Sequence, residues 1–518
     1  MPTDQSRFEV QSGGPFVAIQ VGAASFVDEG VTAVLDTVVE RGGATALFLA
    51  TPTWTRGTGG RQLPGHPFPD HGLQEYDTEW RGGSFVNLHP EFYRRTVLGA
   101  CGRASEHGDW DMFEAVLPEA RRRGLSSYAW MEESSYAQAL RDYPGFPGCL
   151  EKDVWNRPAP RPCFNNPDYR NWHLAIVEDY LKNNDLDGLA WCSERPGPLN
   201  LALQGHVEAQ DLTCFCSYCR GLVAENGVDV AHAIDGYRRL LQWNHRAASM
   251  VGTERGDGAF VELWRLLLDY PEILAWQHHW TTSQRQLYRD IYGTAKGVRA
   301  EVKVGWHIYH NLSFSPFYRA DQDYTELGEC SDFLKVVAYD NCAGPRFYTW
   351  VRGICRTLFS GVNESLVYEF LSGVLNLAEA RLDDLPSAGF SAEYVRRETE
   401  RARRASPRSC SIYTGIDIDI PVSDPRPPGR QEPPIAHCTR RGVRDAVLAA
   451  FAGGADGVVL SRKYSEMTID NLSGAGDALR ELAGMPVRQK EADGHASGPS
   501  PQRPSPSITA PAVRAEQG

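Results

Sequence analysis

The chain has 518 residues, of which 42% are hydrophobic and 23% charged, and its formal net charge is −13. This composition is typical of a globular protein, and the length allows one large domain with insertions or two domains. The negative charge and the absence of a basic stripe with interleaved aromatic residues argue against nucleic-acid binding. No run approaches the ~18 apolar residues of a membrane span. The N-terminus lacks the basic and apolar regions of a secretory signal, so we expect a cytoplasmic protein without membrane contact.

Short apolar runs alternate with helical patterns along the chain. Strands are expected at 15–26, 44–54, 125–134, 186–194, 302–311, 332–341, 410–422 and 456–467. Helical patterns such as those at 112–124, 166–185 and 439–455 separate them. Strands that alternate with helices imply a parallel sheet, and eight of them predict an α/β fold, the (β/α)8 TIM barrel. An open doubly wound sheet is the alternative, but no glycine-rich phosphate fingerprint follows the first strand.

The predicted barrel occupies residues 1–485. It carries a loop-rich insertion at about 55–110 and inserted helices at about 220–300. Residues 486–518 are rich in Pro, Ser and Ala, and we expect them to be disordered. Active sites of TIM barrels form where the strands end, so residues at the predicted strand ends are the candidates for chemistry.

These strand ends are rich in acids, histidines and aromatic residues. No G-x-S-x-G elbow and no H-E-x-x-H motif is present. An acid-rich barrel mouth without a phosphate loop suits the hydrolysis of glycosidic bonds, in which two carboxyl groups flank the scissile bond. Any single acid at a strand end can equally cap a helix or pair with an arginine.

Glu194 is the strongest of these acids. It follows the apolar run LDGLAWC and precedes a Pro-Gly turn. We expect Trp191 to remove the carboxyl group partly from water and so to raise its pKa, as a general acid requires. A surface ion pair with the adjacent Arg195 is the alternative.

Three cysteines lie within six residues, Cys214, Cys216 and Cys219, in the stretch TCFCSYC. Reduced thiols at this spacing favour a metal site over a disulfide, and a tetrahedral zinc site needs a fourth ligand. Cys163 precedes the helix that leads to the Glu194 strand. Four free thiols are the alternative.

The order of Cys163, the helix opening NPDYRNW, the Glu194 strand and Cys-x-Cys-x-x-Cys covers about residues 160–225. It resembles glycoside hydrolase family 42, the bacterial β-galactosidases, and the hypothetical glycoside hydrolases of the same barrel type. The resemblance implies a glycosidase for a small glycoside or oligosaccharide, with Glu194 as general acid/base. It also implies a structural Zn²⁺ held by Cys163, Cys214, Cys216 and Cys219. Ser193 departs from the pattern, because the family has Asn there.

The resemblance also implies a Glu as nucleophile at the end of the seventh strand, and this chain departs from it because no Glu ends the predicted seventh strand. Asp417 and Asp419 in SIYTGIDIDIPV are the candidates for the second carboxylate, as nucleophile or as the base that activates water. Strand alternation puts both on one face. A separation of roughly 5 Å from Glu194 would imply retention of anomeric configuration, and about 6.5 Å or more would imply inversion.

Further residues at the strand ends are predicted to contact the substrate. They are Trp54, Trp191, His307, His310, Asp340, Arg462, Lys463 and Tyr464. The cations among them could meet a sugar carboxylate or pair with Asp417 or Asp419, and the histidines could bind sugar hydroxyls or pack in the barrel wall. The predicted partner is a small carbohydrate, and the resemblance allows a homo-oligomer.

Two other functions stay open. A metal-dependent lyase or isomerase would use His307, His310, Asp340 and Glu194 around a divalent ion. A catalytically inactive barrel would bind carbohydrate without turnover.

Overall fold

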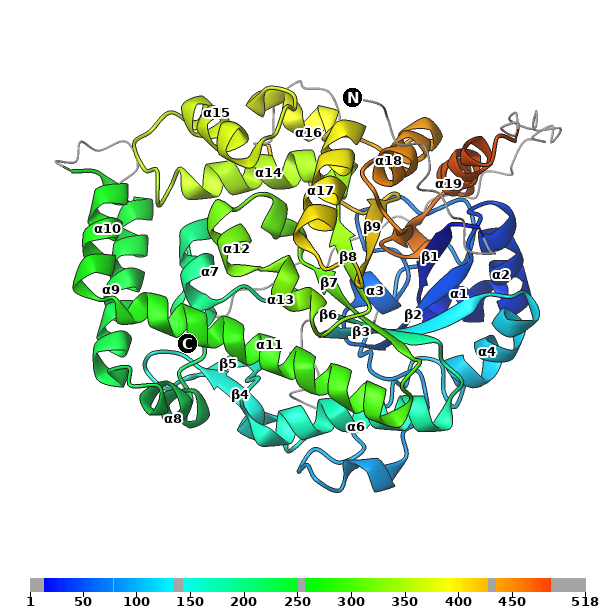
Figure 1. Ribbon diagram of the computed structural model, residues 1–518, viewed down its shortest axis with the longest axis horizontal. Coiled ribbons are helices and arrows are strands. Elements are labelled where there is room, and N and C mark those ends of the chain that lie inside the picture. Colours follow the sequence, from blue (N-terminus) through cyan, green and yellow to red (C-terminus); the bar gives the residue numbers. More distant parts are fainter. Residues whose placement is uncertain (1–13, 78, 134–142, 250–256, 427–434, 486–518) are drawn as a thin grey trace, which may run out of the picture.

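The computed structural model describes residues 14–77, 79–133, 143–249, 257–426 and 435–485. Eight parallel strands close into a barrel in the order β1, β10, β9, β8, β7, β6, β3, β2 (Figure 1). They are β1 (Phe16–Val21), β2 (Ala46–Thr53), β3 (Ser126–Glu133), β6 (Gly188–Ser193), β7 (Lys303–Ile308), β8 (Phe333–Val337), β9 (Ser411–Asp417) and β10 (Gly457–Ser461). Each falls within a predicted strand, so the (β/α)8 barrel is confirmed. The tail predicted at 486–518 lies outside the described residues.

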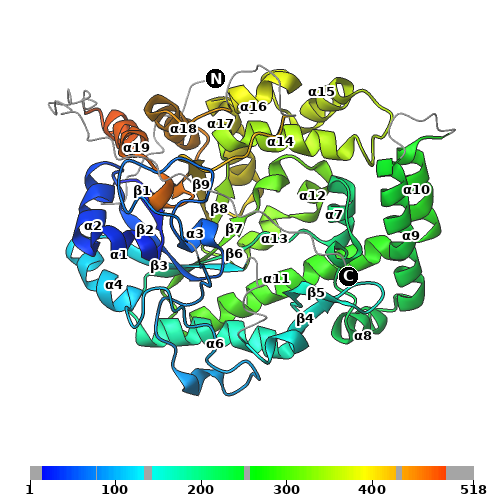
Figure 2. The ribbon, with the colours of Figure 1, turned by 180° about the vertical axis from the view of Figure 1, so that it is seen from behind.

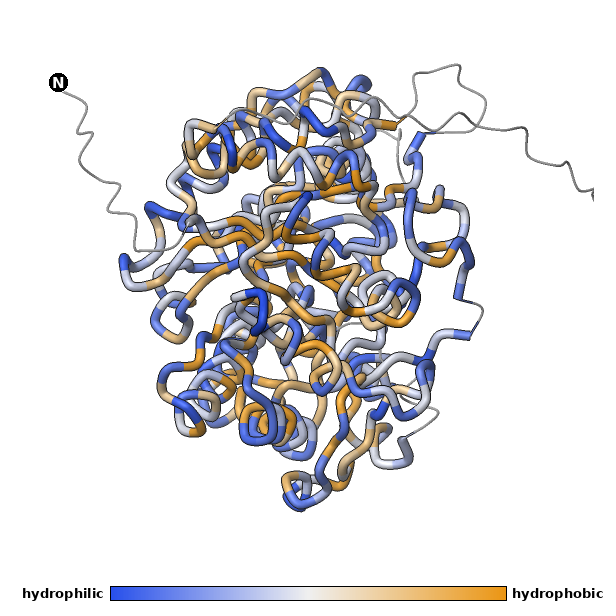
Figure 3. The backbone as a smooth tube through the Cα atoms, turned by 90° about the vertical axis from the view of Figure 1, so that its right-hand side faces the viewer, coloured by the Kyte–Doolittle hydropathy of each residue, from blue (hydrophilic) through white to orange (hydrophobic). Residues whose placement is uncertain are grey.

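The barrel strands are apolar along nearly their whole length because both of their faces are covered. Inward side chains, among them Phe48, Tyr128, Trp130 and Phe333, fill the barrel, while the alternate side chains pack against the helices. Gly305 leaves the space that the Phe333 ring occupies, since a Cβ there would approach that ring to 2.4 Å. Figure 3 shows the apolar strands in the middle of the molecule and polar segments around them.

Helices connect consecutive strands and surround the barrel. Outside the β6–β7 connection they are α1 (Ala23–Glu29), α2 (Val31–Glu40), α3 (Arg56–Gly59), α4 (Met112–Arg122), α6 (Pro167–Asn183), α12 (Pro316–Asp321), α13 (Tyr324–Gly328), α14 (Asp340–Ile354), α15 (Glu364–Leu375), α16 (Leu385–Ala388), α17 (Ala392–Ala405), α18 (Arg440–Ala452) and α19 (Ile469–Leu482). Their starts have local causes. At α6 the Asn166 side chain accepts hydrogen bonds from two backbone N–H groups, and Pro167 takes the first helical position.

The connection from β6 to β7 holds α7 (Pro198–Gln204), α8 (Ser217–Glu225), α9 (Val230–Ser249), α10 (Ala259–Asp269) and α11 (Glu272–Val298). Helices α8 to α10 extend to one side of the barrel, and α11 returns alongside α6 (Figures 1 and 2). A second apolar cluster holds this extension together and includes the four cysteines 163, 214, 216 and 219. A short antiparallel pair, β4 (Leu150–Lys152) and β5 (Pro158–Pro162), lies beside it. Of the helices in the described ranges, none is long and apolar enough to cross a membrane.

Candidate active site

Glu194 lies directly after β6, at the carboxyl end of the barrel, and its Oε1 accepts a hydrogen bond from His307 Nε2 at 3.1 Å. His307 is on β7 beside Cys192 of β6, so the register of two neighbouring strands brings the acid and the imidazole together. The Glu194 side chain is 41% exposed, whereas that of His307 is 6% exposed. Glu194 borders an open cleft that is also lined by Tyr309, Arg346 and Trp350.

The charge state of Glu194 differs from the sequence-based expectation. Burial acts to raise the pKa of Glu194, but the hydrogen bond from His307 and the positive charges of Arg346 and Lys335 outweigh it and lower that pKa. The pKa of His307 is also lowered, by burial and by Lys335, so the imidazole is neutral and donates its Nε2–H. Glu194 is therefore ionised near neutral pH, and the prediction of a raised pKa is wrong.

Trp191 does not contribute to this cleft. It is 1% exposed and packs edge-on against His173 of α6, Tyr288 of α11 and Trp306 of β7. Its side chain thus lies in the layer between sheet and helices, because strand alternation turns it away from the inward Cys192. The expected contact with a substrate or with the Glu194 carboxyl group does not form.

Arg195 forms ion pairs with two buried acids and not with its neighbour Glu194. Its guanidinium is 4% exposed and contacts Glu133 at 2.7 Å and Glu151 at 2.6 Å. Glu133 also accepts a hydrogen bond from Ser193 Oγ at 2.6 Å. A buried ion-paired triad therefore stands on the outer side of β3 and β6, and the surface pair of Glu194 with Arg195 is not seen.

Lys335 is a site residue that the sequence-based reasoning missed. It lies on β8 with its side chain inside the barrel, fully buried, and Nζ donates to Gln20 Oε1 at 2.9 Å and to Tyr339 Oη at 3.1 Å. Burial lowers the pKa of Lys335 to about 7, although Glu194 and Glu132 partly oppose this shift. The single lysine in the run DFLKVVAYD was the available signal, since alternation on a barrel strand turns it inward with Phe333.

This amine makes the stability of the protein depend on pH. Because the folded-state pKa is about 7 and the ordinary value 10.5, the unfolded chain binds more protons between these pH values, and stability rises with pH across that window. We expect Lys335→Met to be more stable than the natural chain by several kcal/mol at pH 7 and below, with the difference shrinking toward pH 10.5. Urea unfolding over this pH range measures it, with the half-exposed Lys182→Met as control. A difference independent of pH would contradict the buried ammonium.

The two aspartates at the end of β9 hold helices. Asp417, 1% exposed, accepts hydrogen bonds from the backbone N–H groups of Asn341 at 3.4 Å and Cys342 at 3.0 Å, in the first turn of α14. Asp419 accepts from the backbone and hydroxyl of Thr468 and from Asn471 at 2.8–3.0 Å, at the start of α19.

These aspartates do not share a face as predicted. The strand ends at Asp417, and Asp419 has a left-handed φ of 54°, so alternation does not continue to it. Asp419 borders a separate pocket with His437 and Cys438. Among the described residues around the Glu194 cleft, neither aspartate is present.

Several other predicted contact residues are buried by protein partners. His310, 1% exposed, accepts from Arg346 and contacts Tyr394, and its pKa is lowered well below the usual value by burial and by Arg346. Asp340 is buried close to Asp417, which together with burial raises its pKa. Trp54 packs on Trp172 in the outer layer.

The three residues after β10 are likewise engaged in the fold. Arg462 pairs with Glu466 of the same turn. Lys463 is fully buried and donates to the carbonyl groups of Arg56, Gly60 and Arg61 at 2.8–3.1 Å. Tyr464 donates to Glu29 at 3.2 Å. The expected ion pairs of these cations with Asp417 or Asp419 do not form.

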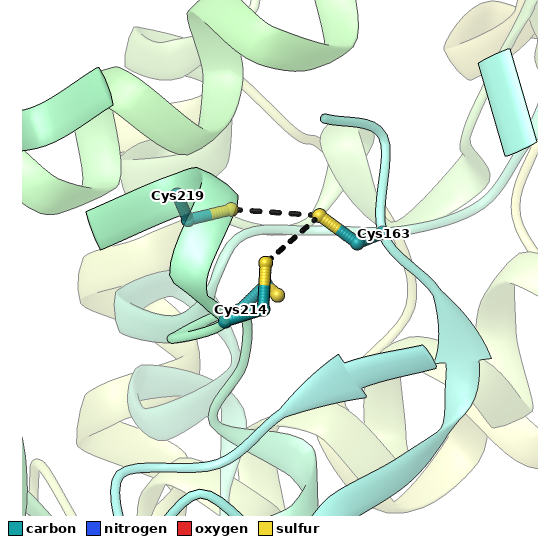
Figure 4. Close-up of side chains that lie close together, drawn as sticks. Cys163, Cys214 and Cys219 are labelled. Atoms are coloured by element: carbon teal, nitrogen blue, oxygen red, sulfur yellow. Dashed lines mark hydrogen bonds between the residues drawn. The ribbon is translucent and has the colours of Figure 1, made fainter. Parts of the chain in front are cut away.

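The four predicted cysteines come together although Cys163 is distant in sequence. Their sulfur atoms all lie within 4.8 Å of one another, and Cys163 Sγ is 3.5 Å from those of Cys216 and Cys219. Figure 4 shows the side chains of Cys163, Cys214 and Cys219 pointing toward one another. A tetrahedral zinc with Zn–S bonds of about 2.3 Å places its sulfurs roughly 3.8 Å apart. The Asn165 backbone N–H points at Cys163 Sγ, a donor of the kind that supports thiolate ligands. The donor set and its spacing therefore fit such an ion.

No protein-family model matches the chain, and a search of curated proteins finds no match. Solved structures do match its fold. An α-L-fucosidase isoenzyme 2 from Paenibacillus thiaminolyticus is 11% identical, with a TM-score of 0.47 over 91% of this chain and 49% of that one. A β-galactosidase from Rahnella sp. R3 is 14% identical, with a TM-score of 0.48 over 92% and 57%. The glycoside hydrolase domain of PgaB from Bordetella bronchiseptica is 13% identical, with a TM-score of 0.43 over 91% and 98%.

The chain thus spans about half the length of the first of these enzymes and 57% of the second. At these identities the likeness concerns the fold alone and does not single out family 42. The (β/α)8 barrel of this chain is shown by its own closed order of eight parallel strands.

Proposed function

We propose that the protein is a glycoside hydrolase that acts on a small glycoside or oligosaccharide, with Glu194 as its general acid/base. The observation that carries this proposal is the position of Glu194: a carboxyl group at a barrel strand end, in an open cleft, oriented by a buried imidazole. Tyr309 and Trp350 line the same cleft, and aromatic side chains suit the apolar faces of sugar rings. Glu194 would protonate the leaving oxygen, and its conjugate base would then activate water.

For the second carboxylate we propose Glu132 ahead of Asp417 and Asp419. Glu132 follows the inward Trp130 by two positions on β3, so it points into the barrel, and it pairs in register with Cys192, two residues before Glu194. Its charge raises the pKa of Lys335 and Arg462, which places it within electrostatic range of the same mouth. The carboxylate oxygens of the two aspartates are instead occupied by hydrogen bonds from groups at the starts of α14 and α19.

A screen against aryl α- and β-glycosides tests the proposal, and the anomer first formed, followed by NMR, assigns retention or inversion. Turnover that is lost in both Glu194→Gln and Glu132→Gln would support the pair. Turnover that survives in Glu132→Gln but is lost in Asp417→Asn would assign the role of second carboxylate to Asp417 of β9. Absence of turnover together with glycan binding would favour an inactive carbohydrate-binding barrel. The cytoplasmic location stays a prediction.

His307 should set the pH range of activity. A general acid must be protonated, and His307 helps to lower the pKa of Glu194, so kcat/KM is expected to fall as pH rises through the acidic range. His307→Phe removes the hydrogen bond and should move this alkaline limb to higher pH. The measurement is kcat/KM against pH for both proteins, with His206→Phe, an exposed histidine outside the cleft, as control. An unchanged limb would show that Glu194 does not titrate in it.

We further propose that Cys163, Cys214, Cys216 and Cys219 hold a structural Zn²⁺. Four thiolates complete the tetrahedral coordination of the ion, so it would hold the loops around β6 together. No coordination position would remain for a substrate. We expect one zinc per chain by mass spectrometry of the purified protein, and less than a tenth of that in Cys163→Ser. The matched control is Cys101→Ser, outside the cluster. Full zinc content in Cys163→Ser would contradict the assignment.

A metal-dependent lyase or isomerase is the second candidate function, favoured by one observation. Cys192, Glu194 and His307 offer three ligand atoms within 4.8 Å of one another at the barrel mouth. Three protein ligands and an open position are typical of a catalytic zinc site. A second metal per chain, whose removal by a chelator abolishes turnover, would favour this function. Turnover that is unaffected by the chelator favours the hydrolase.

A further inference from the structure

Arg346 presents a guanidinium to the cleft that Glu194 borders. It lies in α14, lines the cleft, and donates Nη1–H to His310 Nδ1 at 2.9 Å. Because that nitrogen accepts, Nε2 of the neutral His310 carries the proton and donates to Tyr394 Oη at 3.2 Å. These two hydrogen bonds, from Arg346 to His310 and from His310 to Tyr394 of α17, hold the guanidinium in place. They use one of its five N–H donors. Among the described residues, Arg346 forms no ion pair shorter than 4.0 Å.

The charge around the cleft is unusual for this chain. The protein carries a net charge of −13, yet Lys335, Arg346 and Arg462 gather at the barrel mouth and influence the pKa of their neighbours there. Arg462 is neutralised by Glu466, and Lys335 is enclosed below the cleft. Arg346 is the cation of the three that borders the open space. A guanidinium fork matches a planar carboxylate in two parallel hydrogen bonds.

We propose that Arg346 forms a subsite for a carboxylate on the substrate, so that the preferred substrates are glycosides of uronic acids. This inference rests on the proposed function and adds the substrate class to it. The carboxylate would receive N–H donors from Arg346 while the glycosidic oxygen faces Glu194. Arg462 and Lys463, which the sequence suggested for this role, are already occupied by protein groups.

Titration of the natural chain with free sugars tests the subsite without any turnover. D-Glucuronate and D-galacturonate should bind about 10–100-fold more tightly than D-glucose and D-galactose, since charge-assisted hydrogen bonds contribute about 1.5–3 kcal/mol. Added salt should weaken only the uronates. Arg346→Gln should remove the preference, Arg346→Lys should keep part of it, and the exposed Arg356→Gln should keep all of it.

Equal binding of uronates and neutral sugars, or no binding of uronates, would overturn the subsite. Preference for galactose 6-sulfate over both uronates would overturn the assignment to a carboxylate. These outcomes are separable from the proposed function, which is tested by hydrolysis of neutral aryl glycosides and its loss in Glu194→Gln.

An exposed apolar surface on α10 and α15 carries a second, independent inference. Two stripes at helical spacing form it: Phe260, Trp264 and Leu268 on α10, and Leu366, Phe370 and Val374 on α15, with exposures of 49–68%. Phe359 joins the stripes, with ring centroids 6.1 Å from Phe260 and 6.3 Å from Phe370. Figure 1 places both helices at the end of the molecule away from β1.

The size of this surface indicates what covers it. The three aromatic side chains carry about 150–250 Å² each and the three aliphatic ones less, so these exposed fractions amount to on the order of 600 Å². That lies at the upper end of the ~300–600 Å² range for the largest patch of an ordinary monomer and is three quarters of the ~800 Å² that each partner of a standard interface buries. Two ion pairs flank the stripes, Asp257–Arg265 and Arg352–Glu364, so positive and negative side chains both lie beside the apolar surface. The net charge of −13 opposes an anionic lipid surface.

We infer that a second copy of this chain covers the α10–α15 surface in a two-fold dimer, with the α10 stripe of one copy on the α15 stripe of the other. Light scattering of the purified chain at micromolar concentration should give twice 57.5 kDa. Trp264→Glu with Phe370→Glu should give the monomer mass with unchanged circular dichroism, whereas the exposed Val97→Glu should leave the dimer intact. A monomeric natural chain, a dimer unaffected by the double substitution, or binding to anionic vesicles that the same substitutions abolish would overturn the inference.

Discussion

Glu194→Gln is expected to lower kcat for glycosides with poor leaving groups by about 10²–10⁴, the usual contribution of a general acid. The amide keeps the size of the side chain but has no proton to give to the departing oxygen. The folded state should be unaffected, because Glu194 is 41% exposed and fills no part of the core. Steady-state kinetics on alkyl glycosides together with the thermal midpoint of unfolding measure both expectations.

The leaving group provides an internal control. A dinitrophenyl group departs without protonation, so its release should be slowed much less by Glu194→Gln than release of an alkyl group. A role limited to binding would affect both substrates alike. Glu225→Gln, an exposed acid on α8, serves as the matched substitution. Unchanged turnover of alkyl glycosides would remove Glu194 from the chemistry.

The barrel was predictable from the sequence because each of its strands is marked by a short apolar run of neighbouring residues. In runs such as PFVAIQV and DGVVL, the residues on both faces of the strand are mostly apolar. This pattern indicates a strand whose two faces are both covered by other parts of the protein. The cysteine cluster was predictable for a similar reason, since three of its four members lie in six residues. In both cases the signal lies within a few neighbouring positions.

The surroundings of the site depend on long-range contacts that local pattern does not contain. Asp417 looks like a catalytic acid in SIYTGID, but α14, which begins 77 residues earlier, supplies the N–H groups that occupy it. Trp191 looks like a neighbour of Glu194, yet strand alternation turns it to the opposite side of the sheet. Arg346 was missed because a cation in an amphipathic helix has no local signature of its direction. The inward direction of Lys335 follows from strand alternation, but only the folded barrel shows that its amine lies buried below the cleft.

Arg195→Met is expected to lower the free energy of unfolding by about 3–5 kcal/mol, the usual cost of removing one partner from a buried ion pair. Glu133 and Glu151 would remain buried without their countercharge. Burial raises the pKa of Glu133, with Arg195 opposing, so the variant's Glu133 should hold its proton to higher pH. The folded variant then binds more protons than the unfolded chain, and its stability should fall as pH rises above the ordinary carboxyl range.

Urea unfolding at pH 5 and pH 8 measures this loss, which should be larger at pH 8. Arg121→Met, which breaks the exposed pair with Asp185, should cost less than about 1 kcal/mol. Adding Glu133→Gln and Glu151→Gln to Arg195→Met should recover most of the stability, because no unpaired charge is left. A triple variant as unstable as Arg195→Met would show that the guanidinium acts by packing on Phe164, 4.0 Å from its ring, and not by charge.

Arg195→Met should affect both the Glu194 cleft and the cysteine cluster, because Arg195 lies between these two candidate sites. It follows Glu194 in the chain, and its Nη2 donates to the carbonyl of Pro162, next to Cys163, at 2.9 Å. Its partner Glu151 accepts a hydrogen bond from Thr213, next to Cys214. Loss of the triad should therefore lower zinc content and hydrolytic activity together, whereas Cys163→Ser should lower zinc first. If Arg195→Met lost activity but kept one zinc per chain, the triad would position Glu194 independently of the cysteines.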